Sequence, residues 1–345
     1  WYRLLQEDKM KEFLKRKEIE ISWQRYGIDV LGSMAYGLFA SLLVGTILNT
    51  IGKEAGIQFL TEYISPIASK SAGAAIGIAV AYALKAPPLV LFASAVVGTA
   101  GYELGGPVGT LFSVLIGAEF GKMVSKETKI DILITPIVTI LIGGVIASFL
   151  GPPLNALMSG IGAVIIQATN LRPFLMGVIV SVIVGMVLTL PISSAALCMM
   201  LGLAGLAGGA AAAGCSAQMI GFAVISFKEN GWGGLSAIGI GTSMLQVPNI
   251  MRNWRIWIPP TIAAAVVGPI STLVFKMENT PLGSGMGTCG LVGQIEAFNA
   301  MEGVPFMSVL TGILATHIIL PAIISYVFYV ILKNIGSSEM LSLIL

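Results

Sequence analysis

The stretch that decides the fold is ILITPIVTILIGGVIASFL, residues 132–150, which carries no charged side chain. A helix needs about 20 consecutive apolar residues to cross the hydrocarbon core of a bilayer. A strand of a membrane β-barrel would instead alternate polar and apolar residues over about ten positions. This run does not alternate, so it predicts a membrane-spanning α-helix.

Four similar runs lie elsewhere along the chain, and the composition agrees with them. Of the 345 residues, 56% are hydrophobic and only 10% are charged, whereas a soluble domain has about 25% charged residues. We therefore expect an all-α polytopic membrane protein with about ten membrane segments. The four further runs are Ile28–Ile51, Phe174–Leu190, Ile256–Phe275 and Phe306–Leu332.

Charge and residue types argue against several other classes of protein. A net charge of +2 gives no reason to expect a nucleic-acid partner. The three cysteines lack paired spacing and lie in apolar or glycine-rich runs, so we expect small buried residues rather than disulfides, metal ligands or nucleophiles. His317, the single histidine, has two open interpretations, an interhelical hydrogen bond or a role in proton coupling. We expect no catalytic residues, metal or cofactor.

Residues 1–25 form a basic segment before the first apolar run. The sequence MKEFLKRKEIEISWQRYG begins at Met10 like a native start, so residues 1–9 are expected to be an upstream extension or a non-native remnant. Basic residues near the ends of membrane helices favour the cytoplasmic side. We therefore predict a cytoplasmic N-terminal segment.

Internal similarity at an offset of about 128 residues predicts two repeats. One matching pair is PLNALMSGIGAV, which starts at Pro153, and PLGSGMGTCGLV, which starts at Pro281. Four further pairs of segments match at similar offsets, and all five occur in the same order in both halves. We expect a first repeat at 26–168, a second at 169–300, and a C-terminal helix and tail at 301–345. Transporters commonly contain such repeats, with the substrate site where the halves meet. Basic loops at corresponding places favour parallel over inverted repeats: Lys122, Lys126 and Lys129 against Arg252 and Arg255.

Several segments are too short or too interrupted to be simple membrane spans. Ala72–Leu84 is followed at once by Lys85, and Gly105–Gly121 begins with Gly-Gly-Pro. Small residues let helix backbones approach closely in lipid. Interrupted helices leave backbone groups that must be buried in protein or line a wet cavity. We therefore expect broken or re-entrant helices around an internal cavity.

The stretch NTPLGSGMGTCGLVGQIEAFNAMEG, residues 279–303, combines glycines with polar side chains. GMGTCG at Gly285–Gly290 matches the pattern GxGxxG, but a dinucleotide site needs a preceding strand, and here a membrane helix precedes it. No Gly-Lys-Ser/Thr follows, which argues against a P-loop. Two interpretations stay open: a close helix contact or re-entrant tip, and backbone N–H groups that face a substrate.

Carboxylates and amides within a membrane are costly and usually face a cavity or a partner. Together they suit a hydroxyl-rich ligand, because each hydroxyl both donates and accepts a hydrogen bond. Glu103 is either a surface carboxylate or a ligand at a helix break. The predicted substrate contacts are Glu302, Glu296, Asn299, Gln294, Glu103 and Asn155, with Gly285 and Gly287 allowing close approach.

Long segments of the chain resemble one bacterial family. They include AVAYALKAPPLVLF (79–92), LGGPVGTLFSVLIGAEFGKMVSKETKIDI (104–132), NGWGGLSAIGIGTSMLQVPNI (230–250) and FKMENTPLGSGMGTCGLVGQI (275–295). Over about residues 10–332 the chain is similar to membrane (IIC) subunits of the phosphoenolpyruvate-dependent phosphotransferase system. The resemblance is to a branch that includes proteins named as regulators of perfringolysin expression.

The resemblance implies a transport subunit of the bacterial cell membrane. In such permeases the IIC subunit binds a sugar and opens alternately to each side, while a separate IIB protein, charged by IIA, phosphorylates the sugar. EGVPF at Glu302–Phe306 resembles a Glu-Gly-x-x-Pro-Phe element of fructose-type permeases shortened by one residue, which implies a sugar-binding role for Glu302. The resemblance also implies a homodimer. Without a IIA or IIB module, the chain is expected not to be an enzyme by itself.

Three functions are therefore compared. The first is an alternating-access transporter of a small polar solute, a sugar or sugar derivative. The second is a membrane sensor or regulator without net transport. The third is an ion-coupled carrier or channel in which Glu103 or His317 takes up protons.

Overall fold

The computed structural model describes residues 12–335 and residue 343. The predictions about Met10, residues 1–9 and the remaining C-terminal tail lie outside these residues. Within them the chain is helical, apart from loops and an isolated antiparallel bridge between Gly205 and Asn279. Six helices there are long and apolar enough to cross a membrane, or up to seven if a bent helix pair forms one span. The expected all-α polytopic class is confirmed, and the count of ten segments stays a prediction.

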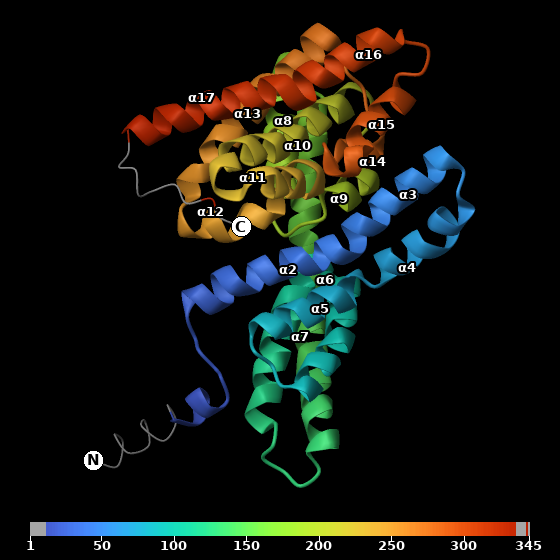
Figure 1. The fold of residues 1–345 in the computed structure, drawn as a ribbon. Coiled ribbons are helices and arrows are strands. Elements are labelled where there is room, and N and C mark those ends of the chain that lie inside the picture. The colour runs from blue at the N-terminus through green and yellow to red at the C-terminus, as the bar shows by residue number, and fades with distance from the viewer. Residues whose placement is uncertain (1–11, 336–342, 344–345) are drawn as a thin grey trace. The chain divides into compact units, whose positions relative to one another are not determined.

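Contacts along the chain define two compact units (Figure 1). Unit 1 comprises Trp1–Leu42 and Ile67–Ala156, and unit 2 comprises Leu43–Pro66 and Leu157–Leu345. These units group residues by contact, whereas the predicted repeats group them by sequence similarity. The repeat boundaries therefore stay a prediction.

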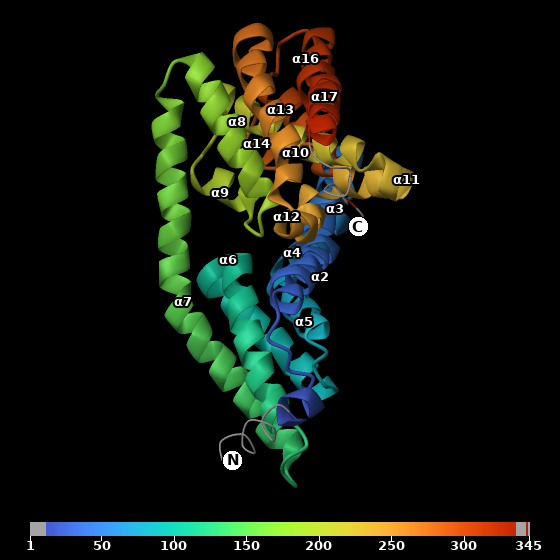
Figure 2. The same cartoon turned by 90° about the vertical axis from the view of Figure 1, so that its left-hand side faces the viewer.

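Unit 1 is built from antiparallel helices that touch through small residues. Its elements are η1 (Gln24–Asp29), α2 (Val30–Leu38), α5 (Ala72–Ala83), α6 (Pro88–Val124) and the first part of α7 (Asp131–Thr169). α5 packs on α2 and on α6 (Figure 2). A Cβ at Gly37 would lie 2.8 Å from the carbonyl oxygen of Ala75, and one at Gly117 would lie 2.9 Å from that of Thr139. Such glycines let the backbones meet without intervening side chains.

The helix α6 folds back on itself and is not one straight span. Gly105 and Gly106 leave helical geometry, with φ +61° and ψ −156° at Gly106. The hydroxyl of Thr110 then donates to the carbonyl oxygen of Gly98 over 3.1 Å. In a straight helix, residues this far apart in the chain would be separated by about 18 Å. The Gly-Gly-Pro interruption is therefore the tip of a helical hairpin whose arms are each about 26 Å long.

Gly231 in unit 2 has nearly the same unusual conformation as Gly106, with φ +57° and ψ −154°. Only glycine adopts this region readily. Gly231 follows the central helix of unit 2, and the chain then turns back so that η4 (Ala237–Gly241) packs on that helix. Each unit thus contains a hairpin with a glycine at its tip, and the predicted duplication stays a prediction.

The N-terminal segment is attached to the open end of the α6 hairpin in unit 1, where α6 begins and ends. Lys122, which the sequence analysis assigned to a basic loop, lies in α6 with only 1% of its side chain exposed. Its Nζ donates to the carbonyl oxygens of Glu18 and Leu84, at 2.9 and 2.8 Å, and pairs with Glu119. Burial of a lysine is tolerated because all three ammonium protons have acceptors.

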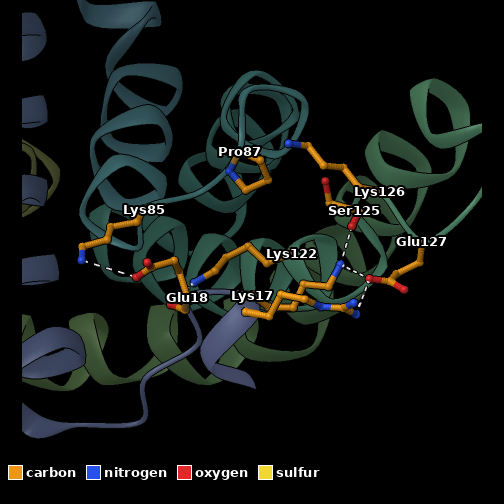
Figure 3. A pocket seen from close by; sticks show the side chains of 9 residues that line it. Lys17, Glu18, Lys85, Pro87, Lys122, Ser125, Lys126 and Glu127 are labelled. Atoms are coloured by element: carbon orange, nitrogen blue, oxygen red, sulfur yellow. Dashed lines mark hydrogen bonds and ion pairs between the residues drawn. The ribbon is translucent and has the colours of Figure 1, made fainter. Parts of the chain in front are cut away.

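Glu127 forms a second link to the N-terminal segment, through ion pairs that are expected to depend on pH (Figure 3). It pairs with Lys17 at 2.5 Å and with Arg16 at 2.8 Å. The hydrogen bond from Lys17 is the main reason that the pKa of Glu127 lies below its ordinary value of 4.5. A lowered folded pKa means that the pairing stabilises above pH 4.5 and is lost as the pH falls through the folded pKa.

We therefore expect residues 12–23 to be protected from hydrogen exchange at pH 7 and to lose this protection below pH 4.5, with each rate expressed relative to the intrinsic exchange rate at that pH. Exchange should be measured after brief exposure to each pH. Glu127→Gln should show the faster exchange already at pH 7. If protection depended on pH in the same way in the variant and in the natural chain, the pairing of Glu127 with Lys17 and Arg16 would not hold the N-terminal segment in place.

Unit 2 is centred on α10 (Gly205–Ile225). Of the 18 consecutive residues that make this helix apolar enough to cross a membrane, 89% are buried. Around it pack α8 (Pro173–Thr189), α13 (Ile258–Ile270) and α17 (Leu320–Ile335) (Figure 1). The sequence GLAGGAAAAGCSAQMIGFAVI explains the central position, because its small side chains let neighbours approach from every side. A Cβ at Gly214 would overlap with the carbonyl oxygen of Ser181 on α8.

The other elements of unit 2 are short. In the chain order, α9 (Ser194–Met200) precedes α10, whereas α14 (Pro281–Ser284), η8 (Cys289–Leu291) and α15 (Val292–Ala300) follow it. α16 (Phe306–Ile313) and η9 (Leu314–Ile319) lead into α17. The remaining elements are α3 (Val44–Ala55), η3 (Phe59–Ile64), α11 (Phe227–Ser236), η5 (Ser243–Gln246), α12 (Val247–Arg252), η6 (Trp254–Trp257) and η7 (Ser271–Phe275). Three elements have residues in both units: η2 (Phe39–Leu43), α4 (Ser65–Lys70) and α7 (Asp131–Thr169).

Candidate functional site

The polar segment 279–303 begins where the chain leaves η7 in an extended conformation. Asn279 forms the isolated bridge with Gly205, in which each backbone N–H donates to the other's carbonyl oxygen, at 3.0 and 3.1 Å. The Asn279 side chain is buried, and its Nδ2 donates to the carbonyl oxygen of Gly293 over 2.9 Å. One residue thus joins the start of α10 to the start of α15.

Thr280 continues this network into the carboxylate of Glu296. The threonine caps α14, since its Oγ1 accepts from the backbone N–H of Gly283 at 3.3 Å. The same hydroxyl donates to Oε2 of Glu296 over 2.6 Å. Glu296 is half-buried, and no partner for its Oε1 is found among residues 12–335 and 343. The carboxylate is held in place by one oxygen while the other remains available as an acceptor.

Asn299 and Glu302 follow Glu296 and are exposed. Asn299 lies one turn beyond Glu296 on α15, so the two share a face of the helix. Glu302 lies in the turn before α16. The opposite side of α15 is packed, with Ala297 buried against Met277 and Ile313, and Phe298 stacks on Phe306 at 5.0 Å. Three of the predicted contacts therefore lie on one short segment whose other face is anchored.

Gln294 has a different environment from the other three. It is buried, and its Nε2 lies 2.9 Å from Nδ1 of His317 on η9. Within the described part of the chain, Oε1 of Gln294 and Nε2 of His317 have no hydrogen-bond partner. Unpartnered buried polar atoms are uncommon and costly. This pair is consistent with the interhelical hydrogen bond expected for His317 and leaves capacity for a further polar group.

Gly285 and Gly287 are buried in close helix contacts. A Cβ at Gly285 would lie 2.5 Å from the carbonyl oxygen of Ser194, and one at Gly287 would lie 2.7 Å from Cβ of Cys215. Gly287 also has φ +53°, which favours glycine. These observations fit the close-packing interpretation of the glycine-rich stretch, and a substrate contact at these glycines stays a prediction.

Two further predicted residues belong to unit 1 by sequence. Glu103 is exposed and lies just before the tip of the α6 hairpin, at the helix break that the sequence indicated. Asn155 lies in α7. Neither is placed relative to the α14–α15 segment, so their joint role with Glu296 stays a prediction.

Sequence reasoning did not identify Asn279 and Thr280 as the residues that hold Glu296. The only available signal was the abundance of polar residues near position 280, because the 16-residue separation of Thr280 and Glu296 follows no helical period. All three cysteines are free and buried, as expected. Among the described residues, no group of three or more His, Cys, Asp or Glu side chains has an arrangement that could hold a metal ion.

The fold and this site define a polytopic α-helical membrane protein in which a threonine hydroxyl holds the carboxylate of Glu296. A protein-family model described as Phosphotransferase system, EIIC matches residues 28–343. The chain therefore belongs to the EIIC family, the membrane transport subunits of the phosphotransferase system, in which separate IIA and IIB proteins carry out phosphorylation. Comparisons with curated proteins and with solved structures found no match. Membership of the perfringolysin-regulator branch stays a prediction.

Proposed function

We propose that this protein is a permease that moves a sugar or sugar derivative across the bacterial cell membrane by alternating access. The observation that carries the proposal is the Glu296 carboxylate, fixed through Oε2 by Thr280 and free at Oε1. Asn299 and Glu302 extend this polar face along the same segment. Carboxylate oxygens accept from sugar hydroxyls, and an amide both donates and accepts.

The same proposal includes the orientation and the partners of the chain. The basic N-terminal segment lies in the cytoplasm, and a IIB protein docks at the basic loops on that side. Two copies of the chain form a homodimer, as in related permeases. Sugar bound near Glu296 and Glu302 is then presented to the IIB protein after the inward-facing state forms.

Counterflow in proteoliposomes tests the transport step without phosphotransfer. Purified protein is reconstituted into vesicles loaded with one unlabelled sugar at a time, and uptake of the labelled sugar is measured. We expect rapid exchange for a sugar and no net accumulation. Addition of IIA, IIB and phosphoenolpyruvate on the cytoplasmic face should convert this exchange into trapped sugar phosphate. Binding without exchange would contradict transport and support the sensor alternative.

A second candidate function, an ion-coupled carrier, is favoured by the buried pair of Gln294 and His317. A histidine within a membrane helix is often part of a proton path, and Nε2 of His317 has no partner among the described residues. Accumulation driven by a proton gradient in the absence of IIA and IIB, and lost in His317→Gln, would support this candidate over the first.

A further inference from the structure

A basic pocket lies at the open end of the unit 1 hairpin, where α5 ends and α6 both begins and ends (Figure 3). Five of its lining side chains are cationic, against two carboxylates, Glu18 and Glu127. The pocket therefore carries an excess of three positive charges before the buried pairing of Lys122 with Glu119 is counted. The cations are Arg16, Lys17, Lys85, Lys122 and Lys126.

Two of these cations serve the fold. Lys122 is fully engaged by Glu119 and two carbonyl oxygens. Lys17 is also buried, with 8% of its side chain exposed, and it donates to the carbonyl oxygen of Ser125 and pairs with Glu127. These two lining residues are buried and already paired, so they are not free to bind a ligand.

The other three cations have donor capacity left. No partner for the ammonium of Lys126 is found among residues 12–335 and 343. Within the described part of the chain, the ammonium of Lys85 has an exposed pairing with Glu18 at 3.4 Å and no second side-chain partner. Arg16 pairs with Glu127 through one nitrogen and is 62% exposed, so its guanidinium keeps further donors. Such a set matches the several acceptor oxygens of a phosphate group.

The backbone indicates that Lys85 and Lys126 are not ordinary surface residues. Both have left-handed φ angles, +55° and +61°. At Lys85, the hydrogen bonds from its own N–H to Tyr82 and from Ala86 to Ala81 form a helix C-cap in which glycine is the usual residue. A lysine at such a position is strained relative to glycine. The position of the Lys85 ammonium at the pocket explains why a lysine, and not a glycine, occupies this strained position.

We propose that this pocket binds a phosphate-bearing anion, which here is the headgroup of an anionic phospholipid. The pocket lies where apolar membrane helices end, the level at which basic pockets meet lipid headgroups. Exposed apolar side chains lie close along the chain to its lining residues, among them Tyr82, Phe120 and Ile130. They provide surface for acyl chains, which a free phosphate ion would not need.

The test is a thermal-shift titration of the purified full chain in detergent with short-chain phosphatidylglycerol, short-chain phosphatidylcholine or inorganic phosphate. We expect phosphatidylglycerol to raise the unfolding temperature, with an effect that weakens as salt is added. The double variant Lys85→Gly/Lys126→Gly should bind phosphatidylglycerol about 30-fold more weakly. Without lipid it should unfold at the same or a higher temperature, because glycine suits both backbone positions.

Lys129→Gly is the matched control, since Lys129 is an exposed lysine of the same loop that does not line the pocket. It should bind the lipid as the natural chain does. Equal lipid affinity in the double variant and the natural chain would overturn the proposal, as would equal stabilisation by phosphatidylcholine. Stabilisation by inorganic phosphate as large as that by phosphatidylglycerol would overturn the assignment to a lipid.

Discussion

Glu296→Gln is expected to reach the membrane in normal amounts and to lose uptake of the transported sugar by about 10-fold to 100-fold. Hydrogen bonds to a charged group contribute about 1.5–3 kcal/mol, which is a factor of this size in affinity. The glutamine oxygen can still accept from Thr280, so the link between α14 and α15 survives the change. Initial uptake rates in proteoliposomes, normalised to reconstituted protein, are the measurement.

Two other carboxylates separate this effect from a general loss of charge. Glu302→Gln should also impair uptake, because Glu302 continues the same segment and is exposed. Glu229→Gln changes an exposed carboxylate on α11, away from the segment in sequence, and should leave uptake unchanged. Normal uptake in both Glu296→Gln and Glu302→Gln would remove the 279–303 segment from the binding site.

Gly214→Ala is expected to prevent unit 2 from folding correctly. The added methyl group would overlap with the Ser181 carbonyl oxygen, a backbone atom that moves only if α8 and α10 separate. Overpacking in a core typically costs 1–3 kcal/mol, and overlap with backbone at a central helix should cost about 3 kcal/mol or more. We expect a large fall in the unfolding temperature and in the yield of monodisperse protein on size-exclusion chromatography.

Gly233→Ala provides the control for this substitution. A Cβ at Gly233 would meet no atom within 4 Å, and its φ lies outside the left-handed region. Because alanine favours helix over glycine, this variant should be as stable as the natural chain or slightly more stable. If Gly214→Ala unfolds at the same temperature as Gly233→Ala, then α8 and α10 do not pack as closely at Gly214 as described here.

The class of fold could be predicted from the sequence because it depends on local properties. An uncharged apolar run such as residues 132–150 is stable only when lipid or other protein surrounds it. The helix break at Gly105 and Gly106 was also visible, because a Gly-Gly-Pro sequence cannot continue a helix smoothly. That α6 then folds back on itself was not, because this depends on contacts between residues such as Thr110 and Gly98.

The candidate site was predicted in composition but not in its connections. The sequence indicated Glu296 and Glu302 because intramembrane carboxylates are costly. It gave no sign that Thr280 holds Glu296 or that Gln294 meets His317, since these pairs join separate helices. Lys122 shows the same limit: a lysine near a basic loop looks solvated until its three acceptors are placed around it.

Cysteine labelling of Asn299→Cys is the most direct test of whether the 279–303 segment forms a wet sugar site. The native cysteines are buried, so a membrane-impermeant maleimide should report the new thiol. We predict labelling from water that the transported sugar slows at concentrations near its apparent affinity, while labelling of Glu229→Cys is unaffected. A thiol at position 299 that reacts only with lipid-soluble reagents, or that reacts equally fast with and without transported sugar, would contradict the account.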